Sequence, residues 1–375
     1  MRVLILSCNT GEGHNSCAAA LKEYFTAHGT HCDVADALSF LSDGLSQFIS
    51  HWHTRIYRYL PFLFRGGYRF AEEHPAVFRE QSKIYRLLTS GAGRLYQFLL
   101  DGGYDTVVCT HVFAAFVIEV LLKEHPGAWR TSFVATDYTC SPHGSGHALD
   151  WYFIPDKALA GEFTQSGIPA EKLVGTGIPV RMGFQGPGDR EKAKADLGIP
   201  ADYRHLLVMC GSMGCGPIRK VVERLSAALP AESAVTVICG TNNRLRQKLE
   251  GQFAGDPRIK IWGYVNQMPL MMDSADLYLT KPGGISVTEA AAKCLPMAFV
   301  DAVAGCEAYN MRYFIERGGA VTADTPEDLA DACVRLLSDR QQLESMSDSL
   351  RALHMGQASG KIYQILTEET VCSLM

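Results

Sequence analysis

Residues 274–292 read SADLYLTKPGGISVTEAAA, and the rest of the chain is organised around this stretch. It predicts a short buried strand at 277–279, a sharp Pro-Gly-Gly turn, and an alanine-rich helix that opens at Ser286. Ser286 and Glu289 have the spacing of a capping box. A glycine turn ahead of a helix N-terminus favours an anion such as phosphate, and the alternative is an ordinary strand–turn–helix connection.

The composition describes a globular protein of two domains. At 375 residues the chain is too long for one ordinary core, and its hydrophobic content is 47%. The net charge of −5 gives no case for nucleic acid as a partner. The 12 cysteines are scattered singly, which indicates a reducing compartment. No signal peptide or transmembrane run is visible, so we expect a cytoplasmic protein.

The N-terminal segment places a histidine at the end of a strand. Residues 2–8 predict a buried parallel strand that runs into a loop containing Gly11 and Gly13, and a helix is expected over 16–28. The loop matches neither a P-loop nor a full dinucleotide fingerprint. His14 lies where open α/β sheets bind ligands, and the helix dipole there favours a neutral imidazole that accepts a proton. The alternative is a histidine that only satisfies a turn.

Two further ionisable residues follow predicted strands in the same half. His111 and Asp137 each come directly after, or one residue beyond, a buried apolar run. Because the C-terminal ends of parallel strands meet at one edge of a sheet, both belong on the same ligand side as His14. His143 and His147 suggest zinc, but no third ligand is placed near them, so we expect no metal site.

Residues 48–98 differ in composition from the rest of the chain. They hold twelve aromatic residues, and eight basic against three acidic residues give a local positive charge in a chain that is negative overall. Aromatic residues interleaved with arginines suit an anionic membrane surface. A nucleic-acid face, a protein interface and a helical insertion with an aromatic core are the alternatives. The residues expected at the membrane are Trp52, Arg55, Arg58, Phe62, Phe64 and Arg65.

The second half repeats the organisation of the first. A linker rich in glycine, proline and charged residues at 183–199 precedes a strand at 205–210, a second glycine loop and a further helix. Two such strand–loop–helix openings predict an α/β protein with two Rossmann-like domains facing each other across a cleft. The expected boundaries are 1–182 for the N-terminal domain, 183–356 for the C-terminal domain, and 357–375 for a C-terminal helix that packs back on the N-terminal domain.

The most specific motif is the nucleotide-sugar signature from Lys281 to Ser286 with Glu289. Other ordered segments accompany it: the loop around Gly13-His14, Thr110-His111-x-Phe113, Thr136-Asp137-Tyr138, Gly177-Ile178-Pro179-Val180, Gly211-Ser212-Met213-Gly214 and Gly263-Tyr264-Val265. Together they resemble the GT-B glycosyltransferases that include monogalactosyldiacylglycerol synthase, the processive diacylglycerol glucosyltransferases and, more distantly, the N-acetylglucosaminyltransferase that forms lipid II.

The resemblance implies inverting transfer of a hexose from UDP-glucose or UDP-galactose to the hydroxyl of diacylglycerol or a related lipid. It implies no metal or other cofactor, and peripheral attachment to the inner face of the cell membrane. It makes His14 the general base, with Asp137 as its alternative or as a residue that orients the acceptor, and it places His111 with Gly11 and Gly13 near the acceptor. The UDP-sugar residues it implies are Gly211, Ser212, Met213, Val265, Pro282, Gly283, Gly284, Ser286, Glu289, Gly305, Glu307 and Asn310.

One departure from the family pattern concerns the donor sugar. Cys306 stands where a glutamine near that sugar is usual, so the sequence leaves the identity of the sugar open. The number of sugars added and the oligomeric state are open as well. A UDP-sugar transferase for a soluble acceptor, a UDP-sugar 2-epimerase and a non-catalytic nucleotide- or lipid-binding protein are the alternative functions.

Overall fold

The chain forms two compact units. The computed structural model describes residues 1–9, 12–41, 82–140, 148–214, 216–300 and 305–372. Unit 1 comprises Met1–Met182, Ala304–Cys306 and Gly356–Met375, and unit 2 comprises Gly183–Val303 and Glu307–Met355. The chain therefore touches unit 1 briefly at Ala304–Cys306 before it completes unit 2, and it returns to unit 1 for its C-terminal segment.

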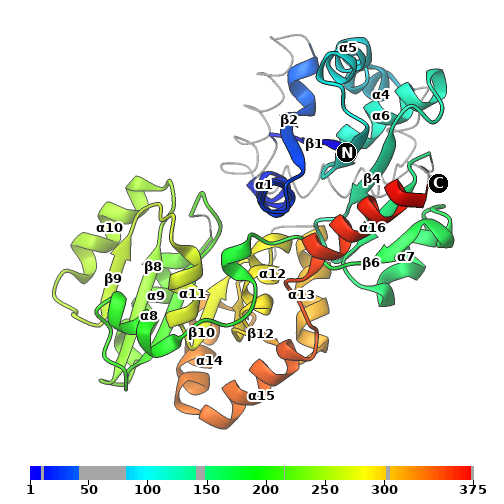
Figure 1. Ribbon diagram of the computed structural model, residues 1–375. Coiled ribbons are helices and arrows are strands. Elements are labelled where there is room, and N and C mark those ends of the chain that lie inside the picture. The colour runs from blue at the N-terminus through cyan, green and yellow to red at the C-terminus, as the bar shows by residue number, and fades with distance from the viewer. Residues whose placement is uncertain (10–11, 42–81, 141–147, 215, 301–304, 373–375) are drawn as a thin grey trace. The chain divides into compact units, whose positions relative to one another are not determined.

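Unit 1 is built on a parallel sheet of six strands in the order β2-β1-β3-β4-β5-β6 (Figure 1). In its register, Val3 lies opposite Cys32 on one side and Thr106 on the other. The inner strands are continuous apolar runs with buried side chains, as is usual in a parallel sheet covered on both faces. The strands are β1 (Arg2–Ser7), β2 (His31–Asp36), β3 (Thr106–Cys109), β4 (Arg130–Val134), β5 (Trp151–Ile154) and β6 (Leu173–Gly175).

The C-terminal helix of the chain belongs to unit 1, where it packs against α1 (Figure 1). Ile362 and Leu366 of that helix are fully buried, and the Tyr363 hydroxyl lies 3.3 Å from Oγ1 of Thr30. The helices of unit 1 are α1 (Glu12–Ala27), α4 (Lys83–Leu88), α5 (Ala92–Gly102), α6 (Val112–Glu124), α7 (Ala160–Gln165) and α16 (Ala358–Cys372), with 3-10 turns at Ala37–Phe40, Lys157–Leu159 and Ala170–Lys172.

Unit 2 is built on a second parallel sheet of six strands, in the order β12-β11-β10-β7-β8-β9. The predicted α/β organisation with two Rossmann-like halves is confirmed by this pair of sheets. The core of unit 2 contains the side chains of the central strands β7, β8 and β10 together with α9 and α14. The strands are β7 (Arg204–Met209), β8 (Ser233–Ile238), β9 (Ile259–Trp262), β10 (Leu277–Thr280), β11 (Met297–Phe299) and β12 (Ala320–Thr322).

The helices of unit 2 surround its sheet (Figure 1). They are α8 (Arg190–Asp196), α9 (Ile218–Ala228), α10 (Asn243–Phe253), α11 (Met268–Ser274), α12 (Gly284–Ala292), α13 (Cys306–Glu316), α14 (Pro326–Ser338) and α15 (Arg340–Arg351), and a 3-10 turn at Met182–Phe184 precedes them. The predicted capped helix after Thr325 is confirmed, since its hydroxyl oxygen accepts a hydrogen bond from the Asp328 N–H at 3.0 Å. Across the described parts of both units, no helix is long and apolar enough to cross a membrane.

The helix after β10 begins earlier than the sequence predicts. Gly283 is the N-cap residue of α12, so the helix starts at Gly284, and no side-chain hydrogen bond caps it. Ser286 and Glu289 both lie inside the helix, and the predicted capping box is therefore wrong. Gly283 is the N-cap because its backbone is extended (φ −76°, ψ 132°) and the residues that follow it are helical.

Both sheets have the strand order that creates a ligand crevice in open α/β folds. In unit 1 the chain leaves β1 towards β2 on one side and later returns to β3 on the other, and in unit 2 it does the same around β7, with β8 and β10. The connections that follow β1 and β3 thus diverge to opposite faces, as do those that follow β7 and β10. Ligands of such sheets bind at the C-terminal ends of the strands, at this switch point.

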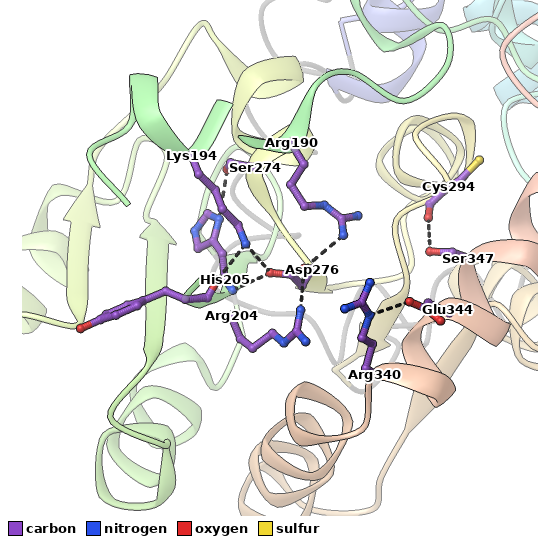
Figure 2. A network of polar contacts seen from close by, with 11 residues as sticks. Arg190, Lys194, Arg204, His205, Ser274, Asp276, Cys294, Arg340, Glu344 and Ser347 are labelled. Atoms are coloured by element: carbon purple, nitrogen blue, oxygen red, sulfur yellow. Dashed lines mark hydrogen bonds and ion pairs between the residues drawn. The ribbon is translucent and has the colours of Figure 1, made fainter. Parts of the chain in front are cut away.

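A buried carboxylate lies at the other end of the unit 2 strands, where β7 and β10 begin. Asp276, which is 3% exposed, accepts hydrogen bonds from Lys194 Nζ at 3.1 Å and from the His205 N–H at 2.9 Å. The guanidinium of Arg190 lies 3.1 Å from the same carboxylate, and that of Arg204 lies 3.8 Å away (Figure 2). Since a buried carboxylate without partners is costly, these contacts tie α8 to the starts of β7 and β10.

The imidazole of His205 is enclosed within the same network. It is fully buried between Thr236 Oγ1, at 2.8 Å, and Ser274 Oγ, at 3.0 Å. Burial lowers the pKa of His205 to about 4, although the hydrogen bond to Ser274 and the charge of Asp276 act in the other direction. The folded protein therefore holds this ring in its neutral form at neutral pH.

The low pKa of His205 predicts that acid weakens the fold. His205 binds a proton near pH 6.5 in the unfolded chain but only near pH 4 in the folded chain. The neutral ring therefore causes no loss of stability above pH 6.5, and the free energy of unfolding decreases as the pH falls from 6.5 towards 4. We expect the free energy of unfolding to drop by about 2 kcal/mol between pH 7 and 5 from this group, measured by urea denaturation. The non-titrating variant His205→Asn should lose correspondingly less, and equal losses would contradict the assignment.

Candidate functional site

The C-terminal ends of β1 and β3 bring two predicted histidines of unit 1 together. His14 lies in the first turn of α1, because that helix begins at Glu12 and not near Ser16 as predicted. His111 is the N-cap residue of α6. The centroids of the two imidazole rings are 4.5 Å apart, in an edge-to-face arrangement. Both rings are half-buried and lie at the switch point of the sheet.

Backbone hydrogen bonds set the tautomers of these two rings. Nδ1 of His14 lies 2.8 Å from the carbonyl oxygen of Thr110, which only accepts, so Nδ1 carries the proton and Nε2 holds the lone pair. Nδ1 of His111 accepts from the N–H of Phe113 at 3.1 Å, so in this ring the proton is on Nε2. The site thus presents one imidazole nitrogen that accepts a proton and one that donates a hydrogen bond.

Thr136 is a member of this site that the sequence argument did not select. Its hydroxyl oxygen lies 3.1 Å from Nδ1 of His14, and its side chain is nearly buried at the end of β4. Asp137 follows it in the chain and is half-buried. The Thr-Asp-Tyr segment was the only signal in the sequence, because the contact joins residues far apart in the chain.

The remaining predicted residues of unit 1 divide between the described and undescribed ranges. Gly13 lies inside α1 and not in a loop. Gly11 lies outside the described residues, and so do all six residues expected at the membrane: Trp52, Arg55, Arg58, Phe62, Phe64 and Arg65.

In unit 2 the turns after β7 and β10 approach each other closely. Gly211 has a φ of +73°, and a Cβ atom placed there would lie 2.8 Å from Cε of Lys281. The left-handed backbone at Gly211 disfavours any other residue, and a side chain there would also displace the end of the Lys281 side chain. The predicted Gly211-Ser212-Met213 turn and the Pro-Gly-Gly turn thus share one volume at the switch point of this sheet.

The turn after β8 supports the first of these loops. The Thr241 N–H donates to the carbonyl oxygen of Ser212 at 2.8 Å. Gly240 has a φ of +56°, and a Cβ atom there would collide with that same carbonyl. The turns after β7 and β8 are therefore fitted backbone to backbone, which is possible only because glycine stands at the contact.

The helix α13 adds two further predicted residues to the turn after β10. Glu307 lies in its first turn, and its Oε1 is 2.7 Å from Nζ of Lys281. Asn310 is fully buried, and its side-chain amide donates to the Pro282 carbonyl at 3.0 Å. Gly305, with a φ of +54°, immediately precedes this helix. Lys281, like Thr136, belongs to a sequence motif but was not among the predicted site residues.

The N-terminus of α12 lies at the turn after β10. Because no side chain caps the helix, the first N–H groups, from Gly284 to Ser286, are not used by a cap, and the positive end of the helix dipole lies at the turn. Glu289 is in the next turn and is 9% exposed. Burial raises the pKa of Tyr278 in β10, and the charge of the Glu289 carboxylate raises it further.

One predicted donor residue stands apart from the others. Val265 follows β9, the edge strand, which β7 and β8 separate from β10, and it is half-buried. Within the described ranges, no three side chains of the His, Cys, Asp and Glu types gather as they would around a metal ion.

The backbone fit of the turns predicts a sharp contrast between two glycines. Gly240→Ala would force a left-handed residue into contact with the Ser212 carbonyl, and we expect it to lower the free energy of unfolding by about 2 kcal/mol or more. Gly251 lies in α10 with open space around its Cβ position, so Gly251→Ala should raise the free energy of unfolding by roughly 0.5–1 kcal/mol. Urea denaturation of both variants tests this, and a loss at Gly251 equal to that at Gly240 would contradict it.

The two halves of the chain match two family models in succession. Residues 14–180 match the model for monogalactosyldiacylglycerol (MGDG) synthase. Residues 205–360 match the model for the C-terminal domain of glycosyltransferase family 28. The first match begins at His14, and the second contains the turns after β7, β8 and β10 as well as α12 and α13.

The chain is also similar to individual proteins over nearly its whole length. A processive diacylglycerol beta-glucosyltransferase of Staphylococcus epidermidis is 26% identical, with 98% of this chain and 92% of that protein covered. MurG of Acinetobacter baumannii has the same fold, with a TM-score of 0.65, 15% identity, and coverage of 98% of this chain and 99% of that one. HepE of Anabaena, in its complex with UDP-glucose, has a TM-score of 0.59, 15% identity, and coverage of 99% and 100%.

These matches confirm the resemblance that the ordered motifs indicated. The fold is GT-B, with two Rossmann-like domains, and both domains match models from one group of glycosyltransferases in the expected order. The chain belongs to the glycosyltransferase family of the MGDG synthases and processive diacylglycerol glucosyltransferases.

Proposed function

We propose that this protein is an inverting glycosyltransferase that moves a hexose from a UDP-sugar, UDP-glucose or UDP-galactose, to the hydroxyl of diacylglycerol or a related lipid. The observation that carries the proposal is the imidazole of His14, whose Nδ1 is bound to the Thr110 carbonyl so that Nε2 is the basic nitrogen. The lipid acceptor is inferred from the relatives, whose name specifies diacylglycerol. Transfer to a soluble acceptor and 2-epimerisation are disfavoured by the same relatives.

The proposed reaction is a single displacement. The acceptor oxygen attacks the anomeric carbon on the face opposite UDP while Nε2 of His14 removes its proton, and the bond from that carbon to the diphosphate oxygen breaks. UDP leaves with the bonding electron pair, so negative charge grows on the diphosphate. Asp137, beside Thr136, is the alternative base or the residue that orients the acceptor. The N–H groups and dipole at the start of α12 are placed to stabilise the leaving group.

The donor is assigned to unit 2 and the acceptor to unit 1. Gly211, Ser212 and Met213 are proposed to border the diphosphate and sugar, with the turn from Pro282 to Gly284 and Ser286 on its other side. Glu289 is proposed to hold the ribose hydroxyls, backbone near Val265 to contact uracil, and Gly305, Glu307 and Asn310 to approach the sugar and phosphate. Related folds bind such donors, since HepE was crystallised with UDP-glucose. The proposal includes no resident metal and no further cofactor.

We also propose that unit 1 binds an anionic membrane surface at the cytoplasmic face. Part of the segment 48–98 is described, and there large apolar side chains are exposed beside basic ones. Ile84 and Leu87 on α4 are 44% and 45% exposed, with Arg86 between them. On α5, Phe98 is 39% exposed, and Arg94, four residues earlier, is exposed as well. Apolar residues flanked by arginines suit insertion among headgroups with contacts to phosphate.

The assignment of the base predicts a loss of turnover without a loss of donor binding. His14→Asn keeps an N–H that can donate to the Thr110 carbonyl but removes the basic nitrogen, so kcat should fall by about 10²–10⁴. The assay is transfer from UDP-glucose and UDP-galactose to diacylglycerol in vesicles, read by mass spectrometry. UDP affinity, measured by calorimetry, should be unchanged, and a variant that keeps more than half of the rate would exclude His14 as the base.

The contact between Thr136 and His14 provides an independent pair of variants. Thr136→Val is nearly isosteric but has no hydroxyl, and we expect kcat to fall roughly fivefold to tenfold because one hydrogen bond to the ring is lost. Thr136→Ser keeps the hydroxyl and should retain most of the rate. Equal losses in both variants would show that packing at this position matters and the hydroxyl does not.

The membrane proposal predicts that charge reversal on α4 weakens lipid binding. Arg86→Glu should reduce binding to vesicles that contain phosphatidylglycerol at least fivefold, since each basic charge near an anionic surface contributes about 1 kcal/mol. Arg219→Glu, an equal change of charge on the exposed face of α9 in unit 2, is the matched control and should bind normally. Sedimentation with vesicles measures both, and the effect should be absent with phosphatidylcholine alone.

A further inference from the structure

Lys281 occupies a position in unit 2 that its motif does not explain. Its side chain passes over Gly211, where a Cβ atom would lie 2.8 Å from Cε and 3.9 Å from Nζ. It also runs beside Gly283, where a Cβ atom would lie 3.8 Å from both Cε and Nζ. The ammonium group is therefore held between the two glycine turns, with glycine on each side where a larger residue would push it away.

A buried carboxylate fixes the ammonium group in this position. Glu307 Oε1 is 2.7 Å from Nζ, and the side chains of Lys281 and Glu307 are 20% and 9% exposed. Removing two charges from water is costly, and the pair is retained here although an apolar pair of the same size would pack without that cost. The charge of Lys281 at this position therefore has a reason beyond packing.

The neighbourhood of the pair is suited to an added anion. The N-terminus of α12 begins at Gly284, directly after the turn that Lys281 opens, and its dipole adds positive potential. The Glu307 carboxylate balances Lys281 while the site is empty. An arriving anion then meets a cation already in place, and no new side-chain ordering is needed.

We propose that Lys281 is the positive charge that compensates the donor's diphosphate and that Glu307 is its positioning residue, and this rests on the proposed function. Lys281 contacts the diphosphate directly. As the bond to the anomeric carbon breaks, negative charge grows on the diphosphate, so the ammonium stabilises the transition state more than the bound substrate. Glu307 acts through Lys281, in contrast to the role near the donor sugar that the family resemblance implies for it.

The two roles of Glu307 predict opposite effects of one substitution. Glu307→Gln keeps an oxygen that accepts a hydrogen bond from Lys281 but removes the negative charge that competes with the diphosphate. If Glu307 positions Lys281, this variant binds UDP as tightly as the wild type or more tightly. If Glu307 instead contacts the sugar, the affinity for UDP is unchanged, but the additional affinity of UDP-glucose over UDP is lost.

The test is calorimetric binding of UDP, UMP and uridine to the full chain and its variants. We expect Lys281→Met to weaken UDP binding by about tenfold to a hundredfold, UMP less, and uridine not at all. The double variant Lys281→Met with Glu307→Gln, which leaves no unpaired buried carboxylate, should show the same loss for UDP. Lys293→Met is the matched control, because Lys293 is also a nearly buried lysine of unit 2 in an ion pair, with Asp273 at 2.9 Å.

Each outcome has a defined meaning. Equal weakening of UDP and uridine by Lys281→Met, or an equal effect of Lys293→Met on UDP, overturns the role of Lys281. Weaker UDP binding by Glu307→Gln, or loss of the hexose contribution alone, overturns the role of Glu307. A wild-type chain that binds UDP in this pattern but transfers no sugar refutes the proposed function and leaves the phosphate role of Lys281 standing. A wild-type chain that binds neither UDP nor uridine overturns both.

Discussion

The close approach of the turns after β7 and β10 is the constraint on which the candidate donor site depends. Parallel pairing of these two strands places the end of each beside the other. Gly211 has a left-handed backbone (φ +73°), the Lys281 side chain lies over it, and the ion pair with Glu307 connects α13 to the same turn. The approach of these two turns thus brings the N-terminus of α12, the Lys281 ammonium and the Glu307 carboxylate into one region of unit 2.

Unit 1 reaches a comparable arrangement with different chemistry. At its switch point two imidazoles lie at the starts of α1 and α6. The main chain sets their protonation, since a carbonyl accepts from His14 and an amide donates to His111. The group that orients His14 is a neutral carbonyl, whereas a charged aspartate orients the histidine of serine hydrolases.

The sequence was sufficient for the features that depend on local pattern. Continuous apolar runs gave the strands, and the positions of His14, Glu307 and Gly211 at their ends followed from the rule that parallel strands end at one edge. It failed where two local signals compete: both Gly283 and Ser286 suit an N-cap, and the backbone selected Gly283. It also could not find the contacts of Thr136 or of Asp276, because these join segments far apart in the chain that only the folded sheet brings together.

The return of the chain to unit 1 has a consequence for how the protein is made. The ribosome releases segments in order from the N-terminus, and domains fold as their residues emerge. Unit 2 is nearly continuous in sequence and is complete once residue 355 has emerged, whereas unit 1 waits for α16, whose buried Ile362 and Leu366 are part of its core. The first unit to be synthesised is therefore the last to be completed. Until α16 has emerged, the α1 face that it covers is a site where chaperones would find exposed apolar surface.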